Sequence, residues 1–224
     1  LKLSGFLFFV VFKCYMKNPW LQIPFQDYEN HMREVGQTEM LSRLFGDSLK
    51  RYKPGSIALI GCATGNGLEE VDPAITRVIH AVDINPAYLE QLNQRFGQTL
   101  PGLNIQCLDL EVDPLSFSNV DLIFCGLVLE YVKPDVLIPE LLHALSPDGA
   151  LVMVIQQNRN TAFVTKTQYR SLDLLSSFAG TVSGAGLYEL LSNLGVGIEM
   201  QYDVPLNDNK SFRVFHCSKN RISS

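Results

Sequence analysis

The sequence lacks two patterns that would point to common classes of protein. No dense run of Lys or Arg occurs in its 224 residues, and the formal net charge is −5. A nucleic-acid partner is therefore not expected, because proteins that bind phosphate backbones present a basic surface. None of the five cysteines forms a Cys-x-x-Cys pair, and no His, Cys and Asp grouping has metal-ligand spacing. No metal site is predicted.

A membrane-spanning run is also missing. Residues 5–12 are apolar and follow Lys2, but the run is too short to cross a bilayer and no small-x-small cleavage site follows it. Because Leu1 is not a methionine and Met16 begins an ordinary stretch, we interpret residues 1–15 as upstream or added sequence. An anchor and an additional helix are the alternatives. No membrane partner is expected unless this segment is an anchor.

What is present is typical of one globular domain. Apolar residues make up 46% of the chain and charged residues 18%, and a chain of this length can bury a full core. Cys62, Cys107 and Cys125 lie in or beside expected strands. We interpret them as reduced core thiols, which predicts a cytoplasmic location.

Short apolar runs alternate with amphipathic segments along most of the chain. Strands are expected at 57–60, 78–82, 104–108, 120–125 and 150–155, with helices before the first, after Pro86 and after Pro134. Continuous apolar strands alternating with helices indicate a parallel sheet covered on both faces. A helix near 187–194 and two strand-like runs, 198–204 and 212–217, follow. The two runs predict a terminal hairpin.

These patterns divide the chain into segments of different roles. Residues 16–55 are expected to form a helical lid and a helix packed against the sheet, and residues 56–218 the α/β domain. Periodicity fades at about 157–186, which predicts a cap outside the sheet, and 219–224 is a tail.

The segment 57–83 carries the strongest chemical pattern. One apolar run ends at Gly61, Gly65 and Gly67 follow, and the next apolar run ends on Asp83. Glycines after a strand let backbone N–H groups approach a ligand, and the carboxylate can accept hydrogen bonds from two ribose hydroxyls. We therefore expect a nucleoside site, the alternative being ordinary turn glycines.

The spacing disfavours a dinucleotide. The Gly-x-Gly at Gly65 and Gly67 is followed by Glu70 where a third glycine is expected. A pyrophosphate would meet a carboxylate there, so a nicotinamide-dependent oxidoreductase is a lesser alternative.

Taken as Gly-x-x-x-Gly-x-Gly before an acidic strand end, the segment resembles the cofactor loop of class I S-adenosylmethionine-dependent methyltransferases. With Asp109 and the terminal hairpin, the resemblance covers roughly residues 56–218. It implies an α/β, doubly wound, mostly parallel seven-stranded sheet with helices on both faces and a C-terminal antiparallel hairpin. It also implies S-adenosyl-L-methionine as cofactor and S-adenosyl-L-homocysteine (SAH) as product.

The resemblance implies a set of cofactor-binding residues at the strand ends. Asp83 corresponds to the ribose ligand, Ile84 to an adenine contact and Asp109 to the acceptor of the adenine amino group. The full set is Gly61, Cys62, Ala63, Gly65, Asn66, Gly67, Asp83, Ile84, Asp109, Leu110, Gly126 and Leu127.

Two positions depart from the family pattern. Leu59 stands where an acidic residue usually orients the methionine end, and Ala63 stands where a glycine is usual. Either Glu29 or His31 from the front segment supplies the missing contact, or cofactor affinity is weaker.

The implied chemistry demands little of side chains. Methyl transfer from a sulfonium is accelerated mainly by holding donor and acceptor together and excluding water, and a base helps where the acceptor loses a proton. The candidates are Tyr28, Glu29, His31, Glu130 and Tyr131. For His31 the alternative is a helix residue bonded to its neighbours, and for Tyr131 it is packing.

Missing sequence motifs narrow the class of methyl acceptor. No Asn-Pro-Pro-Tyr-like or Asp-Pro-Pro-Tyr-like run and no Pro-Cys pair follows the strand at 120–125. These absences argue against methylation of DNA bases, and the run Leu-Val-Leu-Glu-Tyr-Val is similar to that of small-molecule methyltransferases. The sequence predicts methyl transfer to a small molecule, with a catalytically silent cofactor-binding or regulatory protein as the alternative.

Overall fold

A seven-stranded sheet forms the centre of the protein. The computed structural model describes residues 18–219, so the segment 1–15 and residues 220–224 of the expected tail lie outside the described residues. The strands are β1 (Ser56–Ile60), β2 (Val78–Asp83), β3 (Leu103–Cys107), β4 (Val120–Gly126), β5 (Leu145–Asn158), β6 (Val196–Asn207) and β7 (Lys210–Lys219).

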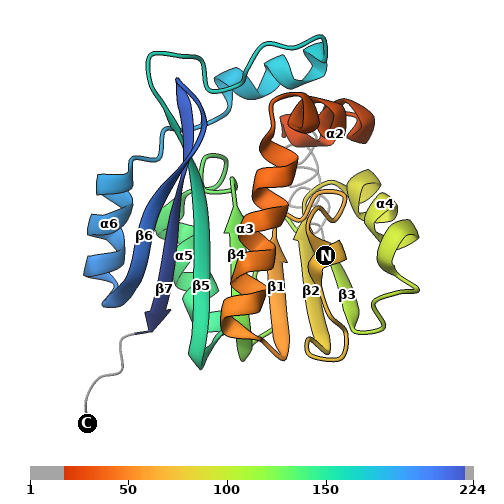
Figure 1. The fold of residues 1–224 in the computed structure, drawn as a ribbon, viewed down its shortest axis with the longest axis vertical. Helices are drawn as coiled ribbons and strands as arrows, with labels where there is room; N and C mark the ends of the chain where they lie inside the picture. Colours follow the sequence, from red (N-terminus) through yellow and green to blue (C-terminus); the bar gives the residue numbers. More distant parts are fainter. Residues whose placement is uncertain (1–17, 220–224) are drawn as a thin grey trace, which may run out of the picture.

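The strand order is β3-β2-β1-β4-β5-β7-β6 (Figure 1). Strands β1 to β5 pair in parallel, whereas β7 is antiparallel to both β5 and β6. The predicted fold class, with its mostly parallel sheet and terminal antiparallel hairpin, is confirmed. The division into segments stays a prediction, and β7 extends one residue past the expected boundary at 218.

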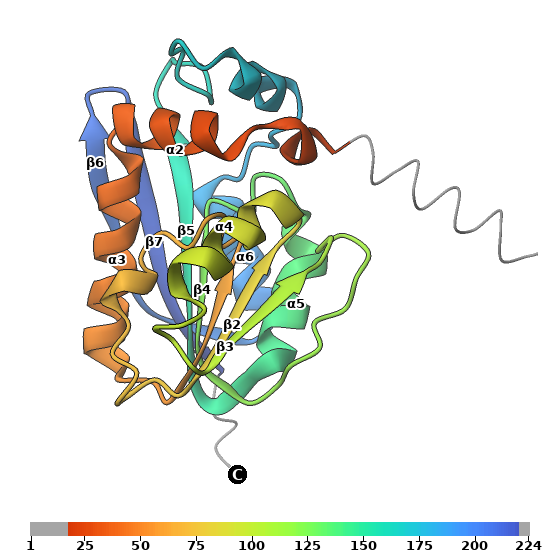
Figure 2. The same ribbon diagram turned by 90° about the vertical axis from the view of Figure 1, so that its right-hand side faces the viewer.

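Helices cover both faces of the sheet. The chain forms η1 (Pro19–Gln22), α2 (Phe25–Glu34), α3 (Gln37–Tyr52), η2 (Leu68–Glu70), α4 (Pro86–Phe96), α5 (Pro134–Ala144), η3 (Arg170–Ser177) and α6 (Gly184–Asn193). Helices α3 and α4 pack on one face and α5 and α6 on the other, and Figure 2 shows α3 and α5 on opposite sides. Within residues 18–219, every helix is too short or too polar to span a bilayer.

On one face of the sheet, helices α3 and α4 bury apolar side chains against the strands and form a hydrophobic core. Phe45 of α3 lies 5.2 Å from Phe124 of β4, ring centroid to ring centroid, and Leu92 of α4 is fully buried. Helix α4 begins sharply because the Asn85 side chain accepts hydrogen bonds from the first-turn amides and Pro86 occupies the first turn, where its missing N–H costs nothing.

The loop after β1 leads into the short 3-10 turn η2, which ends before Pro73. Two expectations about local structure were wrong. Strand β5 begins at Leu145 rather than 150, with a register irregularity opposite Val120 and Leu122. Cys107 is exposed and not a core thiol, because its strand β3 lies at the sheet edge.

The lid and cap lie over the carboxyl ends of the parallel strands (Figures 1 and 2). We define the lid as residues 18–34, containing η1 and α2, and the cap as residues 159–183, containing η3. Ile23 of the lid and Leu172 and Leu175 of the cap share a small buried core. The Ser171 hydroxyl donates to the Asp27 carboxylate at 2.6 Å. Lid and cap therefore form one cover.

Glu130 is a buried carboxylate just beyond β4. Its Oε1 accepts a hydrogen bond from the Gln156 N–H at 2.7 Å, whereas Oε2 has no partner among the described residues. Burial raises the pKa of Glu130 to about 7. A raised carboxyl pKa means that stability falls as pH rises from the unfolded-state pKa through the folded-state pKa.

The Glu130→Gln variant is expected to remove this loss of stability. Its free energy of unfolding relative to that of the wild type should rise by about 2–3 kcal/mol between about pH 5 and about pH 8, from 1.36 kcal/mol per pKa unit. Urea unfolding at both pH values measures the difference. A pH-independent difference would show that Glu130 ionises normally.

Candidate active site

One large cleft opens at the carboxyl edge of the sheet beneath the lid and cap. Its walls include the ends of β1, β2 and β4 and the two covering segments, and it measures about 1400 Å³, its open mouth included. It extends from Asp83, Asp109 and Glu111, at or just beyond the ends of β2 and β3, to Lys210 at the start of β7.

The turn after β1 is shaped by left-handed backbone. Gly61 has φ +67°, and a Cβ built there would lie 2.3 Å from Val128 Cγ2, so only glycine fits. Ala63 has φ +45° although it carries a side chain. The Ala63 N–H donates to Asp83 Oδ2 at 2.8 Å, so this strained turn is tied to the end of β2.

Asp83 lies in the cleft wall with both carboxylate oxygens engaged by backbone. Oδ1 accepts from the Asn85 N–H at 2.9 Å and Oδ2 from Ala63. Burial raises the pKa of Asp83 to about 6, and the backbone donors oppose that rise. The Ile84 N–H is a third backbone donor to this carboxylate, so the group is fixed in place, and its remaining acceptor capacity is available to a hydroxyl donor in the cleft.

Most of the predicted cofactor residues meet in this cleft. The lining residues include Gly61, Cys62, Ala63, Asn66, Asp83, Ile84, Asp109, Leu110, Gly126 and Leu127. Gly65 and Gly67 do not line it: the space beside their Cα atoms is filled by Phe96 and Phe45, so they shape the loop from behind. Burial raises the pKa of the Cys62 thiol, which makes Cys62 a neutral wall residue.

The five candidate bases separate into two groups. Tyr28, His31 and Tyr131 line the cleft, whereas Glu29 and Glu130 do not. Burial raises the pKa of both tyrosines, so they remain neutral phenols.

Glu29 instead connects the lid to the loop. It accepts hydrogen bonds from the Thr64 hydroxyl and from Arg95 Nη1, each at 2.5 Å. It therefore does not replace the acidic residue that Leu59 lacks; of the two substitutes expected, His31 alone lines the cleft.

His31 is bonded across the cover rather than within its helix. Its Nδ1 lies 2.9 Å from the Thr167 hydroxyl of the cap. Burial lowers the pKa of His31, and nearby Lys210 lowers it further. The imidazole is therefore neutral near pH 7, the state that can accept a proton.

Sequence reasoning missed several cleft residues. Tyr88, Trp20 and Lys210 were not among the predicted site residues, yet all three line the cleft. The single tryptophan lies 4.9 Å from the Tyr131 ring and 5.9 Å from the Tyr28 ring, centroid to centroid. Helical periodicity predicts that Tyr88 faces inward, but it does not show whether the side chain packs in the core or lines a ligand site.

A buried polar chain lies at the opposite end of the cleft from Asp83. The Gln37 side-chain amide donates to Gln156 Oε1 at 2.6 Å, and Gln156 Nε2 donates to the Phe163 carbonyl at 2.8 Å. Lys210 Nζ donates to the same carbonyl at 2.6 Å. These side chains come from α3, β5 and β7, so the sheet and the cap meet there.

No set of three or more His, Cys, Asp or Glu side chains within the described chain is arranged to hold a metal ion.

The strand order, the left-handed turn after β1 and the acidic end of β2 define the class I S-adenosylmethionine-dependent methyltransferase fold. The resemblance predicted from the sequence is confirmed, and residues 59–153 match the family described as methyltransferase domain.

Particular relatives are distant. The chain is 26% identical over 136 residues to malonyl-[acyl-carrier protein] O-methyltransferase from Alcanivorax borkumensis (strain ATCC 700651 / DSM 11573 / NCIMB 13689 / SK2). That match covers 58% of this chain and 46% of the relative, so the chain spans less than half the length of that curated protein.

Solved structures agree with the fold. Magnesium protoporphyrin IX methyltransferase (ChlM) from Synechocystis PCC 6803 with bound SAH matches with a TM-score of 0.63 and 15% identity, over 86% of this chain and 87% of that one. The [4+2]-cyclase SpnF matches with a TM-score of 0.61 and 16% identity, over 80% and 81%. At these identities the likeness establishes the fold alone.

The Tyr88→Phe variant is expected to raise stability. The Tyr88 hydroxyl is buried and has no hydrogen-bond partner among the described residues. Removing an unsatisfied buried hydroxyl should raise the free energy of unfolding by about 1 kcal/mol. Urea unfolding of the ligand-free protein measures the change, with Tyr188→Phe, an exposed position on α6, as control. A destabilised Tyr88→Phe variant would contradict the assignment.

Proposed function

We propose that this protein binds S-adenosyl-L-methionine and transfers its methyl group to a small-molecule acceptor, an activity of the EC 2.1.1 class. The observation that carries the proposal is the Asp83 carboxylate, held by two backbone N–H groups in the wall of the cleft. A half-buried carboxylate fixed at the end of β2 beside a left-handed turn suits a ribose diol.

The residues around Asp83 fit the rest of the cofactor. Ile84 and Leu110 supply apolar walls for an adenine ring, and Asp109 supplies an acceptor for its amino group. The unpartnered Tyr88 hydroxyl is a further polar group in the same wall. Gly126 and Leu127 end β4 beside the turn at Gly61, which is where the methionine part would lie.

The comparisons support the same assignment. ChlM, which shares the fold, holds SAH, and the curated relative is an O-methyltransferase. Both proteins are named for methyl transfer to acceptors other than DNA. We take these likenesses as support for a methyltransferase with a small-molecule acceptor.

The bound cofactor would supply an electrophilic methyl group on a sulfonium with a good leaving group. The protein holds the donor and the acceptor in position and excludes water from the cleft. The lid and cap close over the cleft through the Glu29 to Arg95 pair and the Ser171 to Asp27 hydrogen bond, which limits entry of water. Neutral His31 lines the cleft and can accept a proton from an acceptor that carries one.

The location that fits this function is the cytoplasm. Cys62, Cys125 and Cys217 are buried and form no disulfide within residues 18–219, which agrees with a reducing compartment.

The Asp83→Asn variant is expected to weaken SAH binding by about 10- to 100-fold, because hydrogen bonds to a charged group contribute about 1.5–3 kcal/mol. Isothermal titration calorimetry with SAH measures the affinity, and circular dichroism checks folding. Glu140→Gln, which removes an exposed carboxylate of α5, is the matched control and should bind like the wild type. Unchanged affinity in Asp83→Asn would remove Asp83 from the site; a folded wild type that binds no SAH would refute the proposed function.

A further inference from the structure

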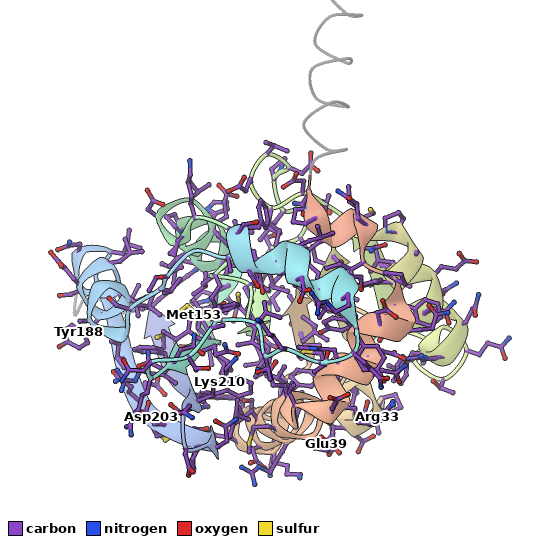
Figure 3. The ribbon with its side chains drawn as sticks, turned by 90° about the horizontal axis from the view of Figure 1, so that it is seen from above. Arg33, Glu39, Met153, Tyr188, Asp203 and Lys210 are labelled. Atoms are coloured by element: carbon purple, nitrogen blue, oxygen red, sulfur yellow. The ribbon has the colours of Figure 1, made fainter. Side chains whose placement is uncertain are left out.

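Lys210 is a buried cation that the cofactor site does not use. It begins β7, only 6% of the residue is exposed, and it lines the cleft. Figure 3 shows it toward the middle of the molecule when viewed from above, whereas Arg33, Glu39 and Asp203 lie toward the rim. A charged side chain placed inside a protein normally has a counter-charge.

The described chain provides no counter-charge for Lys210. Ion pairs among residues 18–219 join Arg95 to Glu29, Arg170 to Asp173 and Arg213 to Asp203, and none includes Lys210. Its one hydrogen bond runs from Nζ to the Phe163 carbonyl. Burial lowers the pKa of Lys210 to about 8, so the ammonium still carries its proton at pH 7. Two N–H donors of this ammonium are left for a ligand.

The polar neighbours of Lys210 are neutral. Gln156 Nε2 donates to the same Phe163 carbonyl, and the imidazole of His31 is uncharged near pH 7. The carboxylates that line the cleft, Asp83, Asp109 and Glu111, belong to the ends of β2 and β3 and the segment after β3. Because β7 is separated from β2 by β5, β4 and β1, Lys210 is at the other end of the cleft.

The walls around this end are apolar and aromatic. The cap contributes Val164 and Leu172, and the Tyr131 ring, beyond β4, lies 6.0 Å from the Phe163 ring, centroid to centroid. Such walls suit a ligand with an apolar body.

The number of cationic side chains that line the cleft indicates the charge of the ligand. Lys210 is the one Lys or Arg among the described residues that line the cleft. A single ammonium balances a monoanion, whereas a phosphate dianion would remain undercompensated in a buried site.

We propose that Lys210 binds the carboxylate of the acceptor, so that the methyl acceptor is a small carboxylic acid with an apolar body. This inference rests on the proposed function, because it assigns the part of the cleft that the cofactor leaves free. It concerns recognition: the ammonium of Lys210 and the carboxylate form a buried charge-assisted hydrogen bond that a neutral analogue cannot form.

If Lys210 only held the cap through the Phe163 carbonyl, the Lys210→Met variant would still bind an acid more tightly than its neutral isostere. Lys219 provides a matched control because it lies on the same strand and its Nζ donates to the Leu145 carbonyl at 2.5 Å, at the opposite end of β7. Lys219 does not line the cleft. Lys210→Met and Lys219→Met each remove one lysine-to-carbonyl hydrogen bond and one charge.

The test compares an acid with its neutral isostere. The full chain, saturated with SAH at pH 7, is titrated calorimetrically with 3-phenylpropanoate and with 3-phenylpropanamide. Wild type and Lys219→Met are expected to bind the acid about 10-fold or more tightly than the amide. Lys210→Met should bind the two about equally while keeping its SAH affinity, and Lys210→Arg should retain a preference for the acid. Inorganic phosphate at matched ionic strength should not displace the acid.

Several outcomes would overturn the inference. These are equal binding of acid and amide by the wild type, binding of neither, displacement by phosphate, or a preserved acid preference in Lys210→Met. A protein that binds SAH but fails this test refutes the acceptor class and leaves the proposed function standing. A folded protein that binds no SAH refutes the proposed function, and the same titrations without SAH then decide the role of Lys210.

Discussion

The parallel register of β1 with its two neighbours is the constraint on which the site depends. Ile60 pairs with Val82 on one side and with Cys125 on the other, so β1, β2 and β4 end at the same level. Gly61, Asp83 and Gly126 are therefore brought to one edge although they are far apart in the chain. A slip of one residue would turn Asp83 to the other face of the sheet and separate it from the Ala63 amide.

The cover over this edge gives the cleft two different ends. At one end, backbone N–H groups fix Asp83 beside apolar side chains, an arrangement complementary to a nucleoside. At the other end, Gln37, Gln156 and Lys210 form a polar chain under aromatic walls. The lid contacts both ends: Asn85 Nδ2 donates to the Trp20 carbonyl at 2.8 Å, and His31 contacts the cap. The lid therefore spans both ends of the cleft.

The parts of the structure that the sequence predicted are those set by local pattern. The sequence predicts three features because each depends on adjacent residues: the continuous apolar strands, the glycine turn at Gly61 and the acidic strand end at Asp83. The burial of Lys210 could not be predicted from the sequence, since it depends on contact with Phe163, 47 residues away in a cap that has no clear periodicity. Glu29 and Glu130 were taken as candidate bases on position alone. The structure places one in an ion pair and the other behind the cleft, because side-chain direction depends on tertiary packing.

Leu59 shows how a departure from a family pattern is absorbed. It is buried in the cleft wall where an acidic side chain is usual, and it packs in the core formed with α3 and α4. The methionine end of a cofactor would therefore meet an apolar wall there. Orientation of that end falls to the turn at Gly61 and Ala63 and to the neutral polar groups of the cover.

A crystal structure of the full chain with SAH tests the central claim most directly, namely that the aligned strand ends bind the cofactor and leave the Lys210 end free. The account predicts both ribose hydroxyls within hydrogen-bond distance of the Asp83 carboxylate, the adenine ring between Ile84 and Leu110, and the sulfur facing the compartment lined by Lys210 and Gln156. SAH bound elsewhere, or a cleft that stays empty at saturating SAH, would contradict it.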